Sequence, residues 1–197
     1  MNIQDRVSAI LRAEAEALNG IHVTPDFENA VLALRDCTGK VLTSGMGKAG
    51  HVARKFASTL CSTGTPASYI HPGEAAHGDL GLVGPEDCIV VFSTSGKTRE
   101  VLEMLRLGRH LGLRTVIGIT SHPDSELRGL SDIVVDMGLI EEPCPHGLTP
   151  TASIVVMLAI GDALALTLME LKGFSRQDFG LRHHGGYLGK QARSTND

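Results

Sequence analysis

The sequence predicts an α/β protein in which a five-stranded parallel sheet lies between two layers of helices. Five short apolar runs alternate with segments of helical periodicity along most of the chain. The runs do not alternate between polar and apolar residues, which is typical of strands buried on both faces of a parallel sheet. The length of 197 residues suits one domain. We therefore expect a doubly wound, three-layer αβα sandwich.

The elements follow in order from these patterns. Apolar residues at helical spacing predict two N-terminal helices, at 3–19 and 27–34. The predicted strands are 41–43, 67–70, 88–92, 115–119 and 133–135, and the later helices are about 51–62, 99–111 and 151–172. Within the single domain we expect N-terminal helices at 1–38, a core with the site loops and last helix at 39–190, and a disordered tail at 191–197.

Composition narrows the class of partner. The formal charge of −4 and the seven aromatic residues do not suit nucleic acid, which needs clustered cations and stacking platforms. Four cysteines without a CxxC pair and a charged N-terminus predict a cytoplasmic protein. The segment 152–171 has the length of a membrane span, but Asp162 lies at its centre. We expect it to be a buried or subunit-interface helix, with no membrane partner.

In a parallel sheet, ligands bind beyond the carboxyl ends of the strands. The loops in question are 44–51, 71–79, 93–100, 120–122 and 141–147, and they hold most of the histidines and many of the 23 glycines. Two strings in these loops resemble nucleotide-binding motifs, but neither motif is complete. The GxGxxG at 45–50 lacks the acid that grips a ribose after the next strand, and Gly96-Lys97-Thr98 lacks the first P-loop glycine, since Val91 stands in its place.

The loop after the third strand predicts a site for one phosphate group. Four hydroxyl side chains precede a helix that starts at Arg99, where backbone N–H groups are free and the helix dipole is positive. These side chains are Ser93, Thr94, Ser95 and Thr98. The alternative is ordinary helix capping by Ser95 or Thr98.

Five further side chains in or beside these loops could move protons: Lys48, His77, Glu100, Glu142 and His183. Beside a phosphate site they indicate proton transfer on a phosphorylated small molecule, such as aldose–ketose isomerisation. A carboxylate of raised pKa would serve as the base, and Lys or His would stabilise an enediolate oxygen. No cofactor is required. Each residue also has a structural alternative: Glu100 as a helix-dipole acid, Glu142 as a solvated loop charge, and His183 as a surface residue.

Three strings carry a resemblance to a known family. They are GMGKAGH at 45–51, HPGEAAHGDLG at 71–81 and CPHGLTPT at 144–151, and shorter matches include STG at 62–64 and GDALA at 161–165. Over about residues 40–190 the chain closely resembles the arabinose-5-phosphate isomerases of the sugar isomerase (SIS) domain superfamily. The resemblance implies interconversion of D-ribulose 5-phosphate and D-arabinose 5-phosphate, which supplies 3-deoxy-D-manno-octulosonate for lipopolysaccharide or capsule synthesis.

The resemblance also implies roles for individual residues. Catalysis falls to Lys48, Glu100, Glu142 and His183, with His77 as a substrate contact that opens the ring or relays protons. Gly47, Gly64 and Thr65 would bind substrate together with the hydroxyl loop. His71 would bind a divalent metal ion that catalysis does not need. Family members are homotetramers whose subunits share sites, which would explain the apolar helix at 152–171.

The sequence departs from the family in three respects. Lys97 stands where an acid is usual, and His184 stands where a proline is usual. The chain stops at Asp197, where many relatives continue into paired CBS domains, so we expect a short form without that regulation. Two alternatives are another SIS isomerase, acting on a hexulose or heptulose phosphate, and a non-catalytic sugar-phosphate-binding module. The joint presence of Lys48, Glu100, Glu142 and His183 favours the enzyme.

Overall fold

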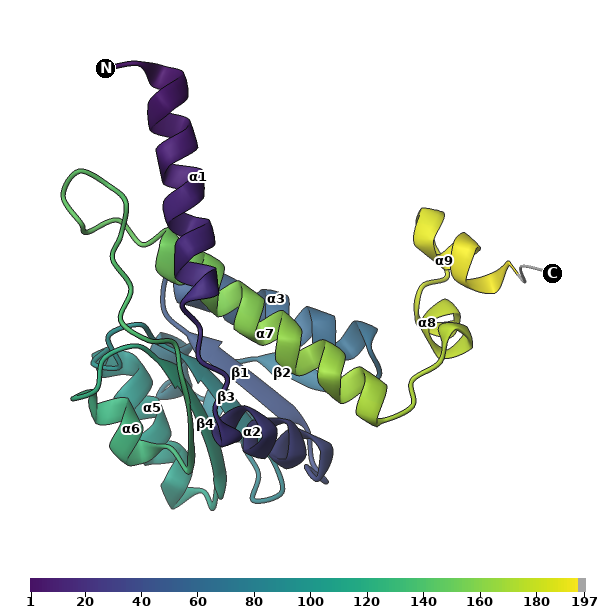
Figure 1. Cartoon of the computed structure of the whole chain (residues 1–197). Helices are drawn as coiled ribbons and strands as arrows, with labels where there is room; N and C mark the ends of the chain where they lie inside the picture. The colour runs from purple at the N-terminus through teal and green to yellow at the C-terminus, as the bar shows by residue number, and fades with distance from the viewer. Residues whose placement is uncertain (195–197) are drawn as a thin grey trace.

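The computed structural model describes residues 1–194, and its centre is the predicted five-stranded parallel sheet (Figure 1). The strands are β1 (Val41–Gly45), β2 (Ala67–Tyr69), β3 (Cys88–Phe92), β4 (Thr115–Thr120) and β5 (Ile133–Asp136). Their order is β2-β1-β3-β4-β5, and every neighbouring pair is parallel. The order reverses direction beside β1 and β3, so their carboxyl ends form the place where such folds bind ligands.

Helices cover both faces of the sheet, which confirms the three-layer sandwich. One face packs against α2 (Pro25–Arg35), α3 (Lys48–Ser62) and α7 (Ala152–Leu171). The other packs against α4 (Pro72–Ala75), α5 (Arg99–His110) and α6 (Glu126–Leu130). Successive residues of β3 point to opposite faces of the sheet. Val90 and Phe92 pack in the core on the α3 and α7 side, and Ile89 and Val91 pack in the core on the α5 side. This double burial is why the strands are apolar without alternation.

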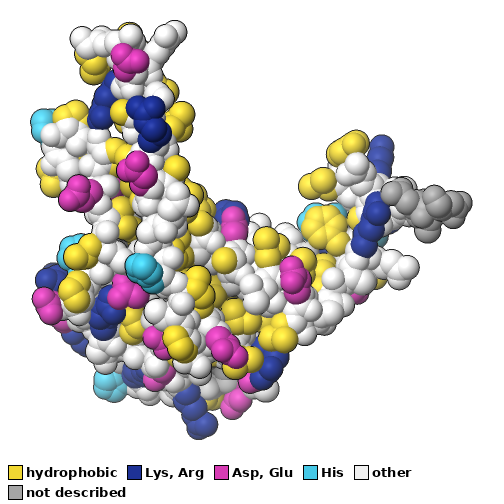
Figure 2. All heavy atoms as spheres, viewed as in Figure 1, with side chains coloured by type: hydrophobic (Ala, Val, Ile, Leu, Met, Phe, Trp, Pro, Cys, Tyr) yellow, Lys and Arg dark blue, Asp and Glu magenta, His cyan; other side chains and the backbone are white. Residues whose placement is uncertain are grey.

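Two parts of the chain extend away from this body (Figures 1 and 2). Helix α1 (Ile3–Asn19) contains no buried residue, and only its C-terminal part approaches α7. At the opposite end, α8 (Arg176–Arg182) and α9 (Gly186–Arg193) pack on each other to form a projecting arm. The arm is basic: it carries Arg176, Arg182, Lys190 and Arg193 against the single acid Asp178.

Several boundaries differ from the sequence-based expectation. Helix α3 begins at Lys48 rather than about residue 51, and the turn Asp79–Leu82 (η1) and helices α4, α6, α8 and α9 were not predicted. All of these have eight residues or fewer, too few to display a helical period. The predicted disorder of 191–193 is wrong, because α9 continues through Arg193, whose guanidinium donates to the carbonyl oxygens of Gly180 and His183. The rest of the predicted tail, 195–197, lies outside the described residues.

Helix α7 is the one helix among residues 1–194 that is long and apolar enough to cross a membrane by length and composition. Half of its apolar window is buried in the protein, where it packs against α3, α2 and α1. Core helices commonly have this composition, and the buried face of α7 agrees with the expectation of a core helix.

Candidate active site

A cavity of about 310 Å³ lies where β1 and β3 end. Its lining comes from three places: the turn and helix start after β1, the hydroxyl loop after β3, and the segment around the start of α7. The lining residues are Met46, Lys48, Ala49, Phe92, Ser93, Thr94, Ser95, Thr98, Pro150 and Ile154. The cavity therefore brings together Lys48 and all four hydroxyl residues that the sequence marked as a phosphate site.

The hydroxyl loop, residues 93–98, is held in an open, anion-accepting shape. Gly96 has a φ of +58°, and a Cβ there would lie 2.4 Å from the Ser125 side chain, so the turn requires glycine. The N–H of Gly96 donates to Ser93 Oγ at 3.1 Å, and Ser93 Oγ lies 3.1 Å from Thr98 Oγ1. These hydrogen bonds link Ser93, at the start of the loop, to Gly96 and to Thr98 at its end.

The hydrogen-bond donors of this loop indicate a ligand site rather than ordinary capping of α5. Thr98 is the N-cap residue of α5, yet its side chain makes no capping hydrogen bond. Ser95 Oγ accepts only the N–H of Lys97, at 3.2 Å, which is a local turn. Among the described residues, the backbone N–H groups of Ser95 and Thr98 have no acceptor. Free N–H groups at a helix start form a site for an anion.

Lys48 reaches the same cavity because of the glycines around it. Gly47, with a φ of 60°, starts α3, so Lys48 is the first helical residue. A Cβ at Gly45 would lie 2.9 Å from Ala49 and Phe92 backbone atoms. The GxGxxG string thus packs β1, β3 and α3 closely and places Lys48 in the lining of the same cavity as the phosphate loop, without the acid that a dinucleotide site needs.

The carboxylate of Glu142 lies directly behind the cavity wall and closes the N-terminus of α7. Its Oε2 accepts the N–H groups of Thr151 and Ala152 at 2.8 and 2.9 Å and the Thr151 hydroxyl at 3.2 Å. Its Oε1 accepts the N–H and the hydroxyl of Ser153. Glu142 is therefore neither a solvated loop charge nor a free base: it is a helix cap supplied by the loop that leads into α7.

These contacts set the ionisation of Glu142. Burial by itself would raise the pKa of the carboxyl group, but the hydrogen bonds from Ser153 and Thr151 outweigh it and hold the pKa below its ordinary value. The expectation of a base with a raised pKa is not met by this residue. Glu142 stays ionised in the neutral range, with its negative charge on the helix end that favours it.

Two of the other predicted residues, Glu100 and His77, do not line the cavity. Glu100 occupies the first turn of α5, two residues after Thr98, and is exposed. His77 is exposed in the loop between α4 and η1. Neither side chain has a hydrogen bond or an ion pair among the described residues.

Three predicted residues lie at the opposite end of the molecule. Gly64 and Thr65 follow α3, whose 15 residues carry the chain about 22 Å back toward the amino ends of the strands. Thr65 Oγ1 there accepts the ammonium of Lys172 at 3.0 Å. His183 ends α8 on the arm, where its ring stacks on Phe179. Because α7 spans about 30 Å, one chain does not bring these residues to its own cavity.

The predicted metal ligand His71 stands apart from other ligands. Its Nδ1 is buried without a hydrogen-bond partner, and its ring lies against Gly73. Within residues 1–194 no group of three His, Cys, Asp or Glu side chains could hold a metal ion. Protein metal sites commonly combine three or four such ligands, so a site at His71 would need ligands from outside residues 1–194.

Sequence reasoning missed some features of this region. Pro150 and Ile154 line the cavity, but nothing in their residue types indicates it. Cys144 gives only a weak metal signal in the sequence. Hydrogen bonds from the backbone N–H groups of Thr149 and Leu148, each 3.2 Å from Sγ, lower the pKa of this thiol to about 6. The loop that ends at the cavity therefore folds around a sulfur atom.

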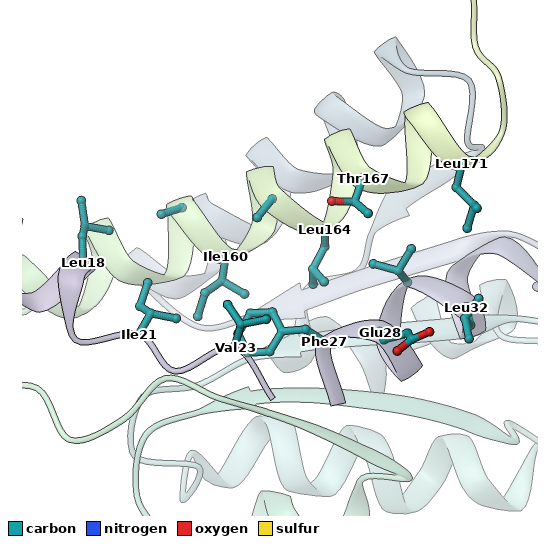
Figure 3. A pocket seen from close by; sticks show the side chains of 13 residues that line it. Leu18, Ile21, Val23, Phe27, Glu28, Leu32, Ile160, Leu164, Thr167 and Leu171 are labelled. Atoms are coloured by element: carbon teal, nitrogen blue, oxygen red, sulfur yellow. The ribbon is translucent and has the colours of Figure 1, made fainter. Parts of the chain in front are cut away.

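A larger hollow of about 800 Å³ lies elsewhere, between α2 and α7 (Figure 3). Figure 3 shows apolar side chains pointing into it from both helices, among them Phe27, Ile160 and Leu164, with Glu28 and Thr167 as polar exceptions. Glu28 is its one ionisable lining residue, and the hollow does not lie at the carboxyl ends of the strands. An apolar hollow of this kind fits contact with another protein surface better than chemistry.

Comparison with known proteins identifies the family. The SIS domain matches residues 33–167. This chain belongs to the SIS domain family. A Yersinia pestis SIS protein named arabinose 5-phosphate isomerase KdsD is 39% identical over 97% of this chain, and the match covers 58% of that relative. The chain thus spans little more than half the length of the curated relatives it matches.

Solved structures of SIS proteins agree in fold over nearly the whole chain. A structure from Bacteroides fragilis has a TM-score of 0.91 at 42% identity and covers 94% of this chain and 100% of its own. The Escherichia coli CFT073 protein c3406, solved in complex with arabinose 5-phosphate, has a TM-score of 0.86 at 39% identity and covers 93% and 100%. Both confirm the three-layer SIS fold.

Proposed function

We propose that this chain is an aldose–ketose isomerase that interconverts D-ribulose 5-phosphate and D-arabinose 5-phosphate through an enediol or enediolate. The observation that carries the proposal is the cavity that Lys48 lines together with the hydroxyl residues 93–95 and 98, whose loop also has free backbone N–H groups. The names of the SIS relatives, and the arabinose 5-phosphate bound in the structure of c3406, support this choice of substrate.

The phosphate group of the sugar binds the hydroxyl loop. Hydroxyls of Ser93, Ser95 and Thr98, free backbone N–H groups and the positive end of α5 complement its negative charge. A phosphate anchored there extends the sugar chain along the cavity toward Lys48. Lys48 then stabilises the negative charge that develops on oxygen as the proton leaves carbon.

The proton transfer itself requires a base, and Glu142 and Glu100 are not equally suited to that role. Glu142 is ionised and held by five donors, so it orients the start of α7 beside Pro150 and Ile154 and keeps a negative charge behind the reacting atoms. Glu100 is free of such partners among the described residues and is the more available proton acceptor. His77 opens the sugar ring or relays protons. The reaction as written needs no redox cofactor.

The complete site is shared between copies in a homotetramer. His183 on the projecting arm, and Gly64 with Thr65 at the far end of α3, serve the cavity of a neighbouring subunit. The arm is basic while residues 1–171 carry 13 cations against 20 acids, so charge favours contact of the arm with a second copy. Apolar side chains of α7 and of the hollow beside it become buried between subunits.

The product supplies 3-deoxy-D-manno-octulosonate for lipopolysaccharide or capsule, and the enzyme acts in the cytoplasm on its soluble sugar phosphate. The direct test incubates the purified chain separately with D-ribulose 5-phosphate, a hexulose 6-phosphate and sedoheptulose 7-phosphate, followed by NMR. Formation of D-arabinose 5-phosphate, and much slower turnover of the others, is expected. Turnover of a longer ketose alone would reassign the substrate, and binding without turnover would indicate a sugar-phosphate-binding module.

A further inference from the structure

The loop that follows β4 holds the phosphate loop in place. Three donors, one from the last residue of β4 and two from this loop, converge on one atom, the carbonyl oxygen of Thr94. The N–H of Ser121 donates to it at 3.0 Å, the Thr120 hydroxyl at 3.2 Å and His122 Nδ1 at 3.1 Å. Most backbone carbonyls accept one or two hydrogen bonds, so this peptide group is fixed unusually firmly.

The orientation of that peptide group decides where a ligand donor points. The C=O of Thr94 and the N–H of Ser95 belong to one planar trans peptide, so they point in opposite directions. While the β4 loop holds the carbonyl, the N–H of Ser95 must face the other way. Ser95 lines the cavity, and its N–H has no acceptor among the described residues. This N–H is therefore preset as a phosphate donor.

His122 is the member of the trio whose contact depends on an exposed side chain. A carbonyl oxygen can only accept, so Nδ1 must carry the hydrogen and Nε2 takes no part in the contact. The backbone of His122 is fixed as well: its carbonyl accepts Arg128 Nε at 2.8 Å, and Arg128 pairs with Asp136 at 2.7 Å. The imidazole is thus positioned from the end of β5 through α6.

We propose that His122 is a positioning residue for the substrate phosphate: its Nδ1–H holds the Thr94–Ser95 peptide so that the Ser95 N–H faces the anion. This inference rests on the phosphate site of the proposed function. Nothing in the chemistry step involves His122, so its loss affects binding and leaves the proton transfer intact. A loop that must be ordered by the ligand binds it more weakly than a preset one.

Two amide variants separate this role from general packing. The side-chain nitrogen of Asn lies close to the position of Nδ1, whereas that of Gln lies close to Nε2. We expect His122→Ala and His122→Gln to raise the dissociation constant for inorganic phosphate, and KM for D-ribulose 5-phosphate, by roughly 3- to 10-fold, as for the loss of one hydrogen bond. His122→Asn should stay within about twofold of the wild type, and kcat should stay within about twofold in all three.

His110 provides a matched control. Its Nδ1 also donates to a backbone carbonyl, that of Arg106 at 2.7 Å, but at the far end of α5. His110→Ala should leave phosphate binding unchanged. Equal phosphate affinity for wild type, His122→Ala and His122→Gln would overturn the inference, as would a His122→Asn variant as weak as the alanine variant. A wild type that binds no phosphate would overturn the phosphate site itself, whereas phosphate binding without isomerisation would overturn only the proposed reaction.

Discussion

At the scale of single residues, the fate of Glu142 shows how one contact can combine a structural role with an electrostatic one. Its carboxylate satisfies backbone N–H groups at the start of α7 that would otherwise lie unpaired behind the cavity. The same bonds lower its pKa, and they place its charge at the start of α7, next to the cavity-lining residues Pro150 and Ile154. Substitution of this residue should therefore change both the stability of the fold and the rate of the reaction.

Glu142→Gln removes the charge and directs an NH₂ group at N–H donors. We expect a loss of about 1–2 kcal/mol in the free energy of unfolding, as for loss of a helix cap. We also expect a fall in kcat of about 10²–10³, as for the loss of one preorganised electrostatic group in a site. Because the folded pKa lies below the unfolded one, the wild type gains stability above the unfolded value and loses it as pH falls through the folded value.

Thermal melts of both proteins between neutral and acid pH measure this difference. The gap in melting temperature should be largest at neutral pH and should close in acid. If the difference in melting temperature did not depend on pH, the ionised carboxylate would not be what stabilises the wild type. If the variant had a normal kcat, the charge of Glu142 would play no part in the reaction.

Gly96 tests whether the shape of the phosphate loop matters. Gly96→Ala should place a Cβ 2.4 Å from Ser125 in a backbone region that disfavours side chains, so we expect phosphate binding to weaken at least tenfold and stability to fall by about 1–3 kcal/mol. Gly129→Ala on α6 is the control, because a Cβ there has open space and alanine favours helix. Isothermal titration with phosphate gives the answer; unchanged binding by Gly96→Ala would contradict the proposed loop.

At the scale of elements, sequence periodicity predicted the strands and the long helices. It did not predict the short helices, or which end of the molecule each loop reaches. The strands, α1, α2, α5 and α7 follow from periodicity and burial. The short helices α4, α6 and α8 have too few residues to show a period. The resemblance groups Gly64 and Thr65 with the site, although they precede a predicted strand and so lie at its amino end. The cap of α7 by Glu142 leaves no local signature, since it comes from a loop ten residues upstream.

Helix α1 carries a prediction of its own. Ile3, Val7 and Leu11 lie four residues apart along one side and are 72%, 52% and 61% exposed. Most of the stability of a helix in a protein comes from packing of its apolar side. Replacing Val7 and Leu11 together by Gln should shift the protein toward smaller assemblies in analytical ultracentrifugation. Glu16→Gln, also exposed on α1, should not, and an unchanged assembly in the double variant would exclude this stripe from the interface.

At the scale of the whole molecule, α7 separates two groups of predicted site residues. Lys48 lies at one end and His183 beyond the other, so in the proposed homotetramer a chain that lacks one of them would still supply the other to a partner. Lys48→Ala and His183→Ala should each be nearly inactive alone. Mixed and reassembled from denaturant, they should regain up to about a quarter of wild-type activity, because some sites then contain both residues. No regain would place both residues in one chain's own site.

The reaction itself is tested most directly in deuterated water. Wild-type protein incubated with D-ribulose 5-phosphate should form D-arabinose 5-phosphate that carries deuterium at C2, because the base exchanges its proton with solvent before returning it to the enediol. NMR detects both the product and the label. Absence of D-arabinose 5-phosphate, with the protein folded and binding phosphate, would contradict the account.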